Sequence, residues 1–424
     1  MPTFLHAADL HVGSPLRGLS LLPPLTAERL RGATRHALRR LVDLALDKQV
    51  QFVVLAGDVY DTQPSVETAL YFRSEMLRLH EAGIPVVIVL GNHDHAGVEV
   101  PNTRLPATVQ VLPADRAATV SPVAGVCVHG RSYPRQDFDE DLTVDYPDTV
   151  RGALNVGLLH TALDTGGSAE HGDYAPTSRA KLEARGYQYW ALGHVHGFQN
   201  MNPDACPMVF SGNLQGRHAR ETGPKGAVLV DYEGDRVVGF AHHALDVMRW
   251  HYVAIDVDDG QRDVAGAAAE RIRHATAQDR DAGRPCVVRV QVTASARATA
   301  DLDDLRTELL GLTQDASDDL SLEKVSLELR TDHGVGSEIE RQLRAIAEGC
   351  ASDPDVQKRL GECLRDIRDE ILKVDRALLS DKGRGYDPEM AALFDATRID
   401  EARALSLLVR GLERVRPLLR KVRS

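Results

Sequence analysis

The chain has few of the features that mark disulfide-rich or membrane-spanning proteins. Its 424 residues include five cysteines, an odd number without a C-x-x-C pair, which favours reduced, mostly buried thiols over a disulfide framework or a zinc knuckle. No apolar stretch approaches the roughly 20 residues that cross a bilayer. The first predicted strand begins at the N-terminus and leaves no room for a signal peptide. We therefore expect a cytoplasmic protein that does not associate with a membrane.

Basic residues are also in deficit. The chain holds 50 Lys and Arg against 62 Asp and Glu, a formal net charge of −12, which argues against a protein that coats nucleic acid by bulk electrostatics. The net charge does not exclude a nuclease, because bound cations and a few local arginines can bind a phosphate without a uniformly basic surface. The length and a hydrophobic content of 43% predict two or three folded domains.

The first half of the chain alternates between apolar runs and amphipathic segments. Apolar residues recur at helical spacing within 26–50, and Ser65 and Gly83 offer the N-cap and the C-terminal stop of a second helix. This alternation of strands and helices is typical of βαβ units. From about Val120, short apolar runs separated by Gly, Pro and Asp predict mostly strands and turns.

The composition shifts after Trp250. Strand-like and helix-like segments alternate from there and predict a compact βαβαβ domain with helices at 264–277 and 301–312. Beyond it, apolar stripes at helical spacing predict a tail of two to four helices. The predicted domains are residues 1–249, 250–333 and 334–424.

Five apolar runs in the first half each end in a polar residue that can bind a metal. In an open α/β sheet, functional groups gather outside the carboxyl ends of the strands, so we expect these strand tips to converge. Each motif alone could be a turn or a cap, but together they predict a dinuclear metal centre. Imidazole, carboxylate and amide ligands without thiolate suit Mn²⁺, Fe²⁺ or Zn²⁺. The seven candidate ligands are Asp9, His11, Asp58, Asn92, His160, His194 and His196.

These motifs resemble those of the calcineurin-like metallophosphoesterases, through D-x-H from Asp9, GD at Asp58, GNHD from Asn92 and GHVH from His194. The resemblance covers roughly residues 1 to 245. It implies an α/β fold, a metallophosphoesterase β-sandwich flanked by helices, to which this chain adds a small α/β capping domain and a helical C-terminal tail.

The resemblance also implies two divalent metal ions, with Mn²⁺ favoured. One ion would be held by Asp9, His11, Asp58 and His196, and the other by Asp58, Asn92, His160 and His194. A shared carboxylate such as Asp58 can keep two cations roughly 3.5–4 Å apart, where they grip one phosphate and supply a nucleophile at neutral pH.

Two residues of the GNHD motif are given further roles. His93 is the candidate to orient the phosphate or to protonate the leaving oxygen, and a hydrogen bond to its own turn is the alternative. Asp94 is expected to support His93 or a ligating histidine.

Other segments resemble the SbcD-type DNA repair exonucleases, and within that group the YhaO-like branch. They include the opening HAADLHVGSPLRGL, GDVYD at 57–61 and SGNLQGRHARETGPKG at 211–226. The resemblance implies that the capping domain holds DNA over the metal cleft and that the tail docks on an SbcC-like coiled-coil ATPase. It also makes a homodimer plausible.

Two small basic patches are candidates for contacting a DNA backbone. Arg131 flanks Tyr133 in one, and Arg217 and His218 follow the GN turn in the other. The alternative is that these are loop charges paired with nearby acids such as Glu221.

We therefore predict a metal-dependent DNA phosphodiesterase of DNA repair, a 3′-to-5′ exonuclease that also cuts single strands internally. Because the metal motifs define the reaction but not the substrate, a small-molecule metallophosphodiesterase of the cyclic nucleotide type is the first alternative, and an inactive scaffold subunit is the second. Asp61 stands where some members of the family carry a histidine, which leaves the balance of exonuclease and endonuclease activity open.

Overall fold

The structure is a computed structural model that describes residues 1–14, 27–28, 31–100, 104–164, 174–257, 264–295, 305, 307–311 and 319–330. Contacts between Cα atoms divide the chain into two compact units, Met1–Arg330 and Thr331–Ser424. The predicted helical tail and part of the predicted helix at 301–312 lie outside the described residues. All elements named from here on belong to the first unit.

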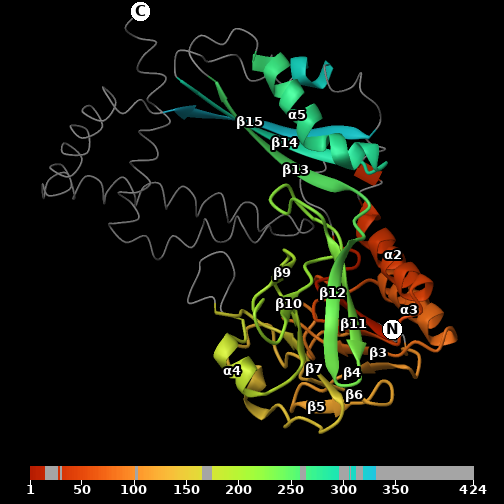
Figure 1. Ribbon diagram of the computed structural model, residues 1–424. Coiled ribbons are helices and arrows are strands. Elements are labelled where there is room, and N and C mark those ends of the chain that lie inside the picture. Colours follow the sequence, from red (N-terminus) through yellow and green to blue (C-terminus); the bar gives the residue numbers. More distant parts are fainter. Residues whose placement is uncertain are drawn as a thin grey trace, which may run out of the picture. The chain divides into compact units, whose positions relative to one another are not determined.

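Two six-stranded sheets form the body of this unit (Figure 1). The first has the order β12-β11-β1-β2-β3-β4, and in it β1, β2, β3 and β4 run parallel. Its strands are β1 (Thr3–Ala7), β2 (Phe52–Ala56), β3 (Val86–Val89), β4 (Val109–Val111), β11 (Gly226–Glu233) and β12 (Arg236–Ala244). The three central strands are apolar runs buried on both faces, as expected for a parallel sheet covered on both sides.

The second sheet has the order β5-β6-β7-β8-β10-β9. Its strands are β5 (Ala118–Val120), β6 (Val126–Gly130), β7 (Leu154–His160), β8 (Tyr189–Gly193), β9 (Gln199–Asn200) and β10 (Met208–Phe210). Side chains of both sheets, among them Phe4, Phe52, Leu158 and Tyr189, pack into one buried cluster. The predicted β-sandwich is therefore confirmed.

Helices cover the outer faces of the sandwich. Helices α2 (Ala33–Asp47) and α3 (Val66–Glu81) share a core cluster with the outer face of the first sheet, and α4 (Arg179–Ala184) packs on the second. The Ser65 hydroxyl accepts a hydrogen bond from the Thr68 amide at 3.2 Å, which confirms the predicted N-cap of α3.

The residues after 248 add a three-stranded parallel sheet of order β13-β14-β15. Its elements are β13 (Arg249–Val257), α5 (Val264–Asp281), β14 (Cys286–Ser295) and β15 (Leu320–Arg330). Apolar side chains of α5 and the strands form a separate core cluster. Trp250, which is 1% exposed, joins this sheet to the body because its Nε1 donates to the carbonyl of Gly216 at 2.9 Å. The predicted domain boundary at residue 250 stays a prediction.

Two further expectations can be compared with the described residues. Within the described residues, Cys127, Cys206 and Cys286 are free thiols, and two of them are buried. None of the described helices is long and apolar enough to cross a membrane.

Candidate metal centre

The predicted ligands follow directly from the strand ends. Asp9 and Asp58 come two residues after the neighbouring parallel strands β1 and β2, whereas His160 ends β7 and His194 follows β8. Because the two sheets pack face to face, the carboxyl ends of these strands meet at one edge of the sandwich. The convergence expected from the sequence is therefore present.

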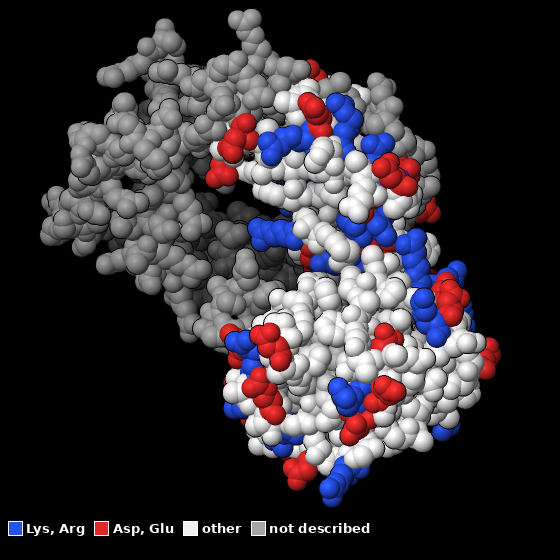
Figure 2. All heavy atoms as spheres, in the orientation of Figure 1, with Lys and Arg blue, Asp and Glu red and all other residues white. Residues whose placement is uncertain are grey.

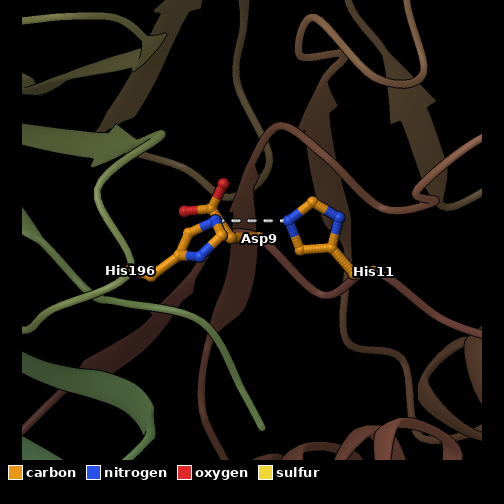
Figure 3. A group of neighbouring side chains, drawn as sticks. All are labelled: Asp9, His11 and His196. Carbon is orange, nitrogen blue, oxygen red and sulfur yellow. Dashed lines mark hydrogen bonds between the residues drawn. The ribbon is translucent and has the colours of Figure 1, made fainter. Parts of the chain in front are cut away.

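One group of possible ligands consists of Asp9, His11 and His196, whose ligand atoms lie within 4.8 Å of one another. The two imidazoles face each other with their Nε2 atoms 3.3 Å apart, and the Asp9 carboxylate lies beside them (Figure 3). Asp9 and His11 are each 1% exposed. The two histidines come from segments separated by 185 residues.

A second group consists of Asp9, Asp58 and His160, again within 4.8 Å. Nε2 of His160 lies 3.6 Å from the Asp58 carboxylate and 3.0 Å from Oδ1 of Asn92. The same oxygen of Asp58 lies 3.9 Å from Nε2 of His11. Asp58 thus stands between the imidazoles of the two groups, which is the position that a bridging carboxylate requires.

His194 joins the two groups through its backbone and its ring. Its N–H lies 3.2 and 3.0 Å from the two carboxylate oxygens of Asp9 and donates to them. Its ring lies edge-on to that of His160, with centroids 5.3 Å apart. All seven predicted ligands therefore gather at one place.

Backbone strain is concentrated at this site. Four of the seven non-glycine residues with positive φ in the described ranges are predicted ligands. They are Asp9, His11, Asp58 and His194, with φ of 51°, 43°, 49° and 105°. Such conformations cost about 1–3 kcal/mol each and cluster at functional sites, where the surrounding structure holds them.

The donor set fits a bound cation. Nδ1 of His11 lies 3.1 Å from Asp61, and Nδ1 of His196 lies 2.7 Å from Glu221. Nδ1 of His196 donates to Glu221, which makes its Nε2 an acceptor, and with the His11 proton likewise on Nδ1 beside Asp61 two acceptors face each other at 3.3 Å and repel. A cation that accepts both lone pairs removes this repulsion and suits two neutral imidazoles.

Burial determines the protonation preferences of these groups. Desolvation and the neighbouring Asp58 raise the pKa of Asp9, and desolvation raises the pKa of Asp58. Desolvation also lowers the pKa of His11 and lowers that of His160 to about 3. Neutral imidazoles beside crowded, buried carboxyls are what a divalent ion stabilises, because it compensates the charge that burial disfavours.

His93 lies at the edge of this centre. Its Nδ1 donates to the backbone carbonyl of Asp61 at 2.8 Å, and its own N–H donates to the Asp58 carboxylate at 3.0 Å. The side chain is 36% exposed, against 23% for His196 and at most 3% for His11, Asp58 and His160. Because Nδ1 is engaged, Nε2 is the ring atom left to meet a substrate.

The prediction that Asp94 supports a histidine is wrong. Its carboxylate accepts backbone N–H groups instead, from Val59 at 2.7 Å, Tyr60 at 3.4 Å and Gly91 at 2.7 Å. Asp94 thereby ties the loop that carries Asp58 to the loop that carries Asn92. Buried backbone N–H groups need acceptors, and the Asp94 carboxylate supplies one to each of the two segments.

The predicted DNA-contacting residues have different hydrogen-bond and ion-pair partners within the protein. Arg131 donates to the carbonyl of Ala114 at 3.0 Å and pairs with Asp145 at 3.4 Å. Tyr133, in the same patch, is 0% exposed and cannot touch a DNA backbone.

The second patch lies beside the metal centre. Arg217 pairs with Asp61 at 2.5 Å, while the His218 side chain is 43% exposed and lies 3.4 Å from Glu221. The acid pairing that was considered as the alternative is therefore present in both patches.

The parts played by Asp61 and Glu221 were not predicted from the sequence. Each places a carboxylate oxygen next to Nδ1 of a predicted ligand histidine. The signal available in the sequence was weak: an acid three residues after the GD motif and another inside the GRHARE segment.

Comparisons with known proteins agree with this geometry. Residues 2–198 match the family of calcineurin-like phosphoesterases. The chain belongs to the calcineurin-like metallophosphoesterases and is thus a phosphoester hydrolase, of a fold that binds a dimetal centre.

Among its relatives, an uncharacterized metallophosphoesterase, YhaO of Bacillus subtilis, is 31% identical over 299 residues, 69% of this chain and 72% of that protein. The DNA double-strand break repair protein Mre11 of Haloferax volcanii is 26% identical over 275 residues, 61% of this chain and 56% of that protein. A subunit of the nuclease SbcCD of Bacillus subtilis is 31% identical over 93 residues, 22% of each chain.

Proposed function

We propose that the protein is a Mn²⁺-dependent DNA phosphodiesterase of DNA repair, acting as a 3′-to-5′ exonuclease that also cuts single strands internally. The observation that carries the proposal is the facing pair His11 and His196 beside Asp58 and His160, with the exposed ring of His93 at the edge. DNA as the substrate is supported by relatives named as a break repair protein and a nuclease subunit.

In this proposal the first cation is held by Asp9, His11, Asp58 and His196, and the second by Asp58, Asn92, His160 and His194. When bound, two such ions activate water and neutralise the charge on a phosphate. The protein's own residues orient the phosphate and protonate the leaving oxygen. The Asp61 carbonyl fixes the ring of His93, whose Nε2 then binds a phosphate oxygen or gives a proton to the leaving oxygen.

Recognition of DNA is proposed to be local. On the face drawn in Figure 2, basic side chains of the described residues are scattered among acidic ones, in keeping with the net charge of −12. The proposed contacts are Arg131, Arg217 and His218, of which His218 has the most exposed side chain. The tail at 334–424 is proposed to dock on an SbcC-like coiled-coil ATPase, and a homodimer is the proposed assembly.

Labelled duplex and single-stranded DNA incubated with the full chain and Mn²⁺ test the proposal directly. The wild type should shorten both substrates, and His93→Gln and Asp58→Asn should abolish cleavage. His95→Gln is the matched control, because His95 is two residues away and its ring accepts the N–H of Gly97. Rapid hydrolysis of small phosphodiesters without any cleavage of DNA would favour the small-molecule alternative.

A further inference from the structure

The two histidines that face each other across the candidate metal centre are held from behind by one connected set of charges. Asp61 contacts Nδ1 of His11 at 3.1 Å, and Glu221 contacts Nδ1 of His196 at 2.7 Å. Arg217 joins these two carboxylates. Its guanidinium donates to Asp61 at 2.5 Å, and its backbone N–H donates to Glu221 at 2.7 Å.

Further hydrogen bonds hold both carboxylates of the set in place. Ser14 donates to the second oxygen of Asp61 at 3.1 Å, and Asn213 donates to Glu221 at 2.9 Å. Glu221 is 8% exposed and the Arg217 side chain is 17% exposed. Side chains that are largely covered and paired have little freedom, so they can hold the rings in one orientation.

The charges of the set also act on the rings. Two carboxylates and one guanidinium leave one negative charge behind His11 and His196. An imidazole that donates Nδ1–H to a carboxylate is a stronger metal ligand at Nε2 than one that donates to a neutral group.

The corresponding partner in the other group is neutral. Nδ1 of His160 lies 2.9 Å from the backbone carbonyl of Ala56 and donates to it. Its neighbour Asn92 is an uncharged amide, 3.0 Å from Nε2 of His160. The two halves of the centre therefore differ in the support that their histidines receive.

We infer that Asp61, Arg217 and Glu221 form a carboxylate–arginine clamp that positions His11 and His196 and makes their cation site the tighter of the two. The inference rests on the two-cation part of the proposed function and names the residues that make the sites unequal. In it Arg217 is a positioning residue that acts through the two carboxylates.

Calorimetric titration of Mn²⁺ into the chelator-treated full chain tests the inference without any measurement of cleavage. The wild type should show two classes of site with different affinities. Asp61→Asn and Glu221→Gln should weaken the tight class by about 10–100-fold, the usual effect of removing a partner of a ligating histidine. Arg217→Gln should weaken the same class, and the weak class should not change.

Arg220→Gln is the matched control, because Arg220 lies on the same loop and is exposed. It should bind Mn²⁺ like the wild type. Thermal melting shows whether each variant folds, and if one acid variant does not, the other acid variant and Arg217→Gln carry the same test.

Three results would overturn the inference: equal affinities at both wild-type sites, variants that weaken only the weak class, or an Arg217→Gln variant that raises KM for DNA while Mn²⁺ binding is unchanged. The last result would leave Arg217 with its proposed role as a DNA contact alone. A wild type that binds two Mn²⁺ ions but cleaves no DNA would contradict the proposal that DNA is the substrate. The Mn²⁺ affinities of the variants would still test the clamp.

Discussion

Replacement of Gly57 by alanine tests whether the close packing between the end of β2 and His160 maintains the second cation site. Gly57 has φ +88°, and a Cβ built on it would overlap Nδ1 of His160 and lie 2.7 Å from Cγ of the same ring. Ordinary carbon contacts are about 3.5–4.0 Å. The ring must therefore move by roughly 1 Å, away from its hydrogen bond to Ala56.

The expected cost has two parts. Positive φ in a residue with a Cβ costs about 1–2 kcal/mol, and forcing a side chain out of a packed interior costs about 1–3 kcal/mol. We expect the free energy of unfolding of the metal-free protein to fall by about 2–5 kcal/mol. Displacement of a catalytic group by about 1 Å lowers turnover by about 100-fold.

Gly83→Ala is the matched control. Gly83 also has positive φ, +73°, but a Cβ there would meet nothing within 4 Å. It should lose only the backbone part of the free energy, about 1–2 kcal/mol, and keep wild-type Mn²⁺ affinity and turnover. Urea unfolding, Mn²⁺ titration and hydrolysis of a chromogenic phosphodiester measure the three quantities. If Gly57→Ala behaves like Gly83→Ala in all three, the reasoning about His160 is refuted.

Three further predictions concern pH, packing and metal removal. Burial lowers the pKa of His6 to about 3, so between pH 6.5 and 3 the unfolded chain binds a proton that the folded chain does not. The free energy of unfolding should therefore decrease as the pH is lowered below 6.5, and at pH 5 the decrease should be about 2 kcal/mol. His6→Gln should remove this loss in urea unfolding, and an unchanged pH profile would contradict it. Trp250→Ala should lower the free energy of unfolding by about 3–5 kcal/mol, because it empties a buried site. Trp250→Phe should cost much less, and equal losses by denaturant titration would count against the packing argument. Chelation should lower the melting temperature, since each ion at 100 times its Kd adds about 2.7 kcal/mol. Added Mn²⁺ should restore it, and a melting curve indifferent to chelator would contradict a metal-bound native state.

The convergence of the candidate ligands could be predicted from the sequence because their placement depends on local patterns. Apolar runs such as FVVLA at β2 and YWALG at β8 are buried parallel strands, and parallel strands bring their carboxyl ends to one edge. Asp58 follows the first run after Gly57, and His194 follows the second run directly. The Ser65 cap was also correctly predicted for a local reason.

The clamp and the part played by Asp94 could not be predicted in this way. Asp61 and Arg217 are 156 residues apart, and nothing in the spacing of either segment indicates that the two meet. Asp94 follows His93 in the chain, yet its carboxylate turns to the backbone of Val59 and Gly91. Side-chain partners depend on which loops the packed sheets bring together, not on the neighbours in sequence.

The sequence by itself thus determined the order of strands and helices and the chemistry at the strand ends, because hydrophobic period and capping act over a few residues. Only the tertiary structure decided which carboxylate supports which histidine. That choice depends on contacts between distant segments, such as Glu221 with His196 and Asp61 with His11, which exist once the two sheets have packed face to face.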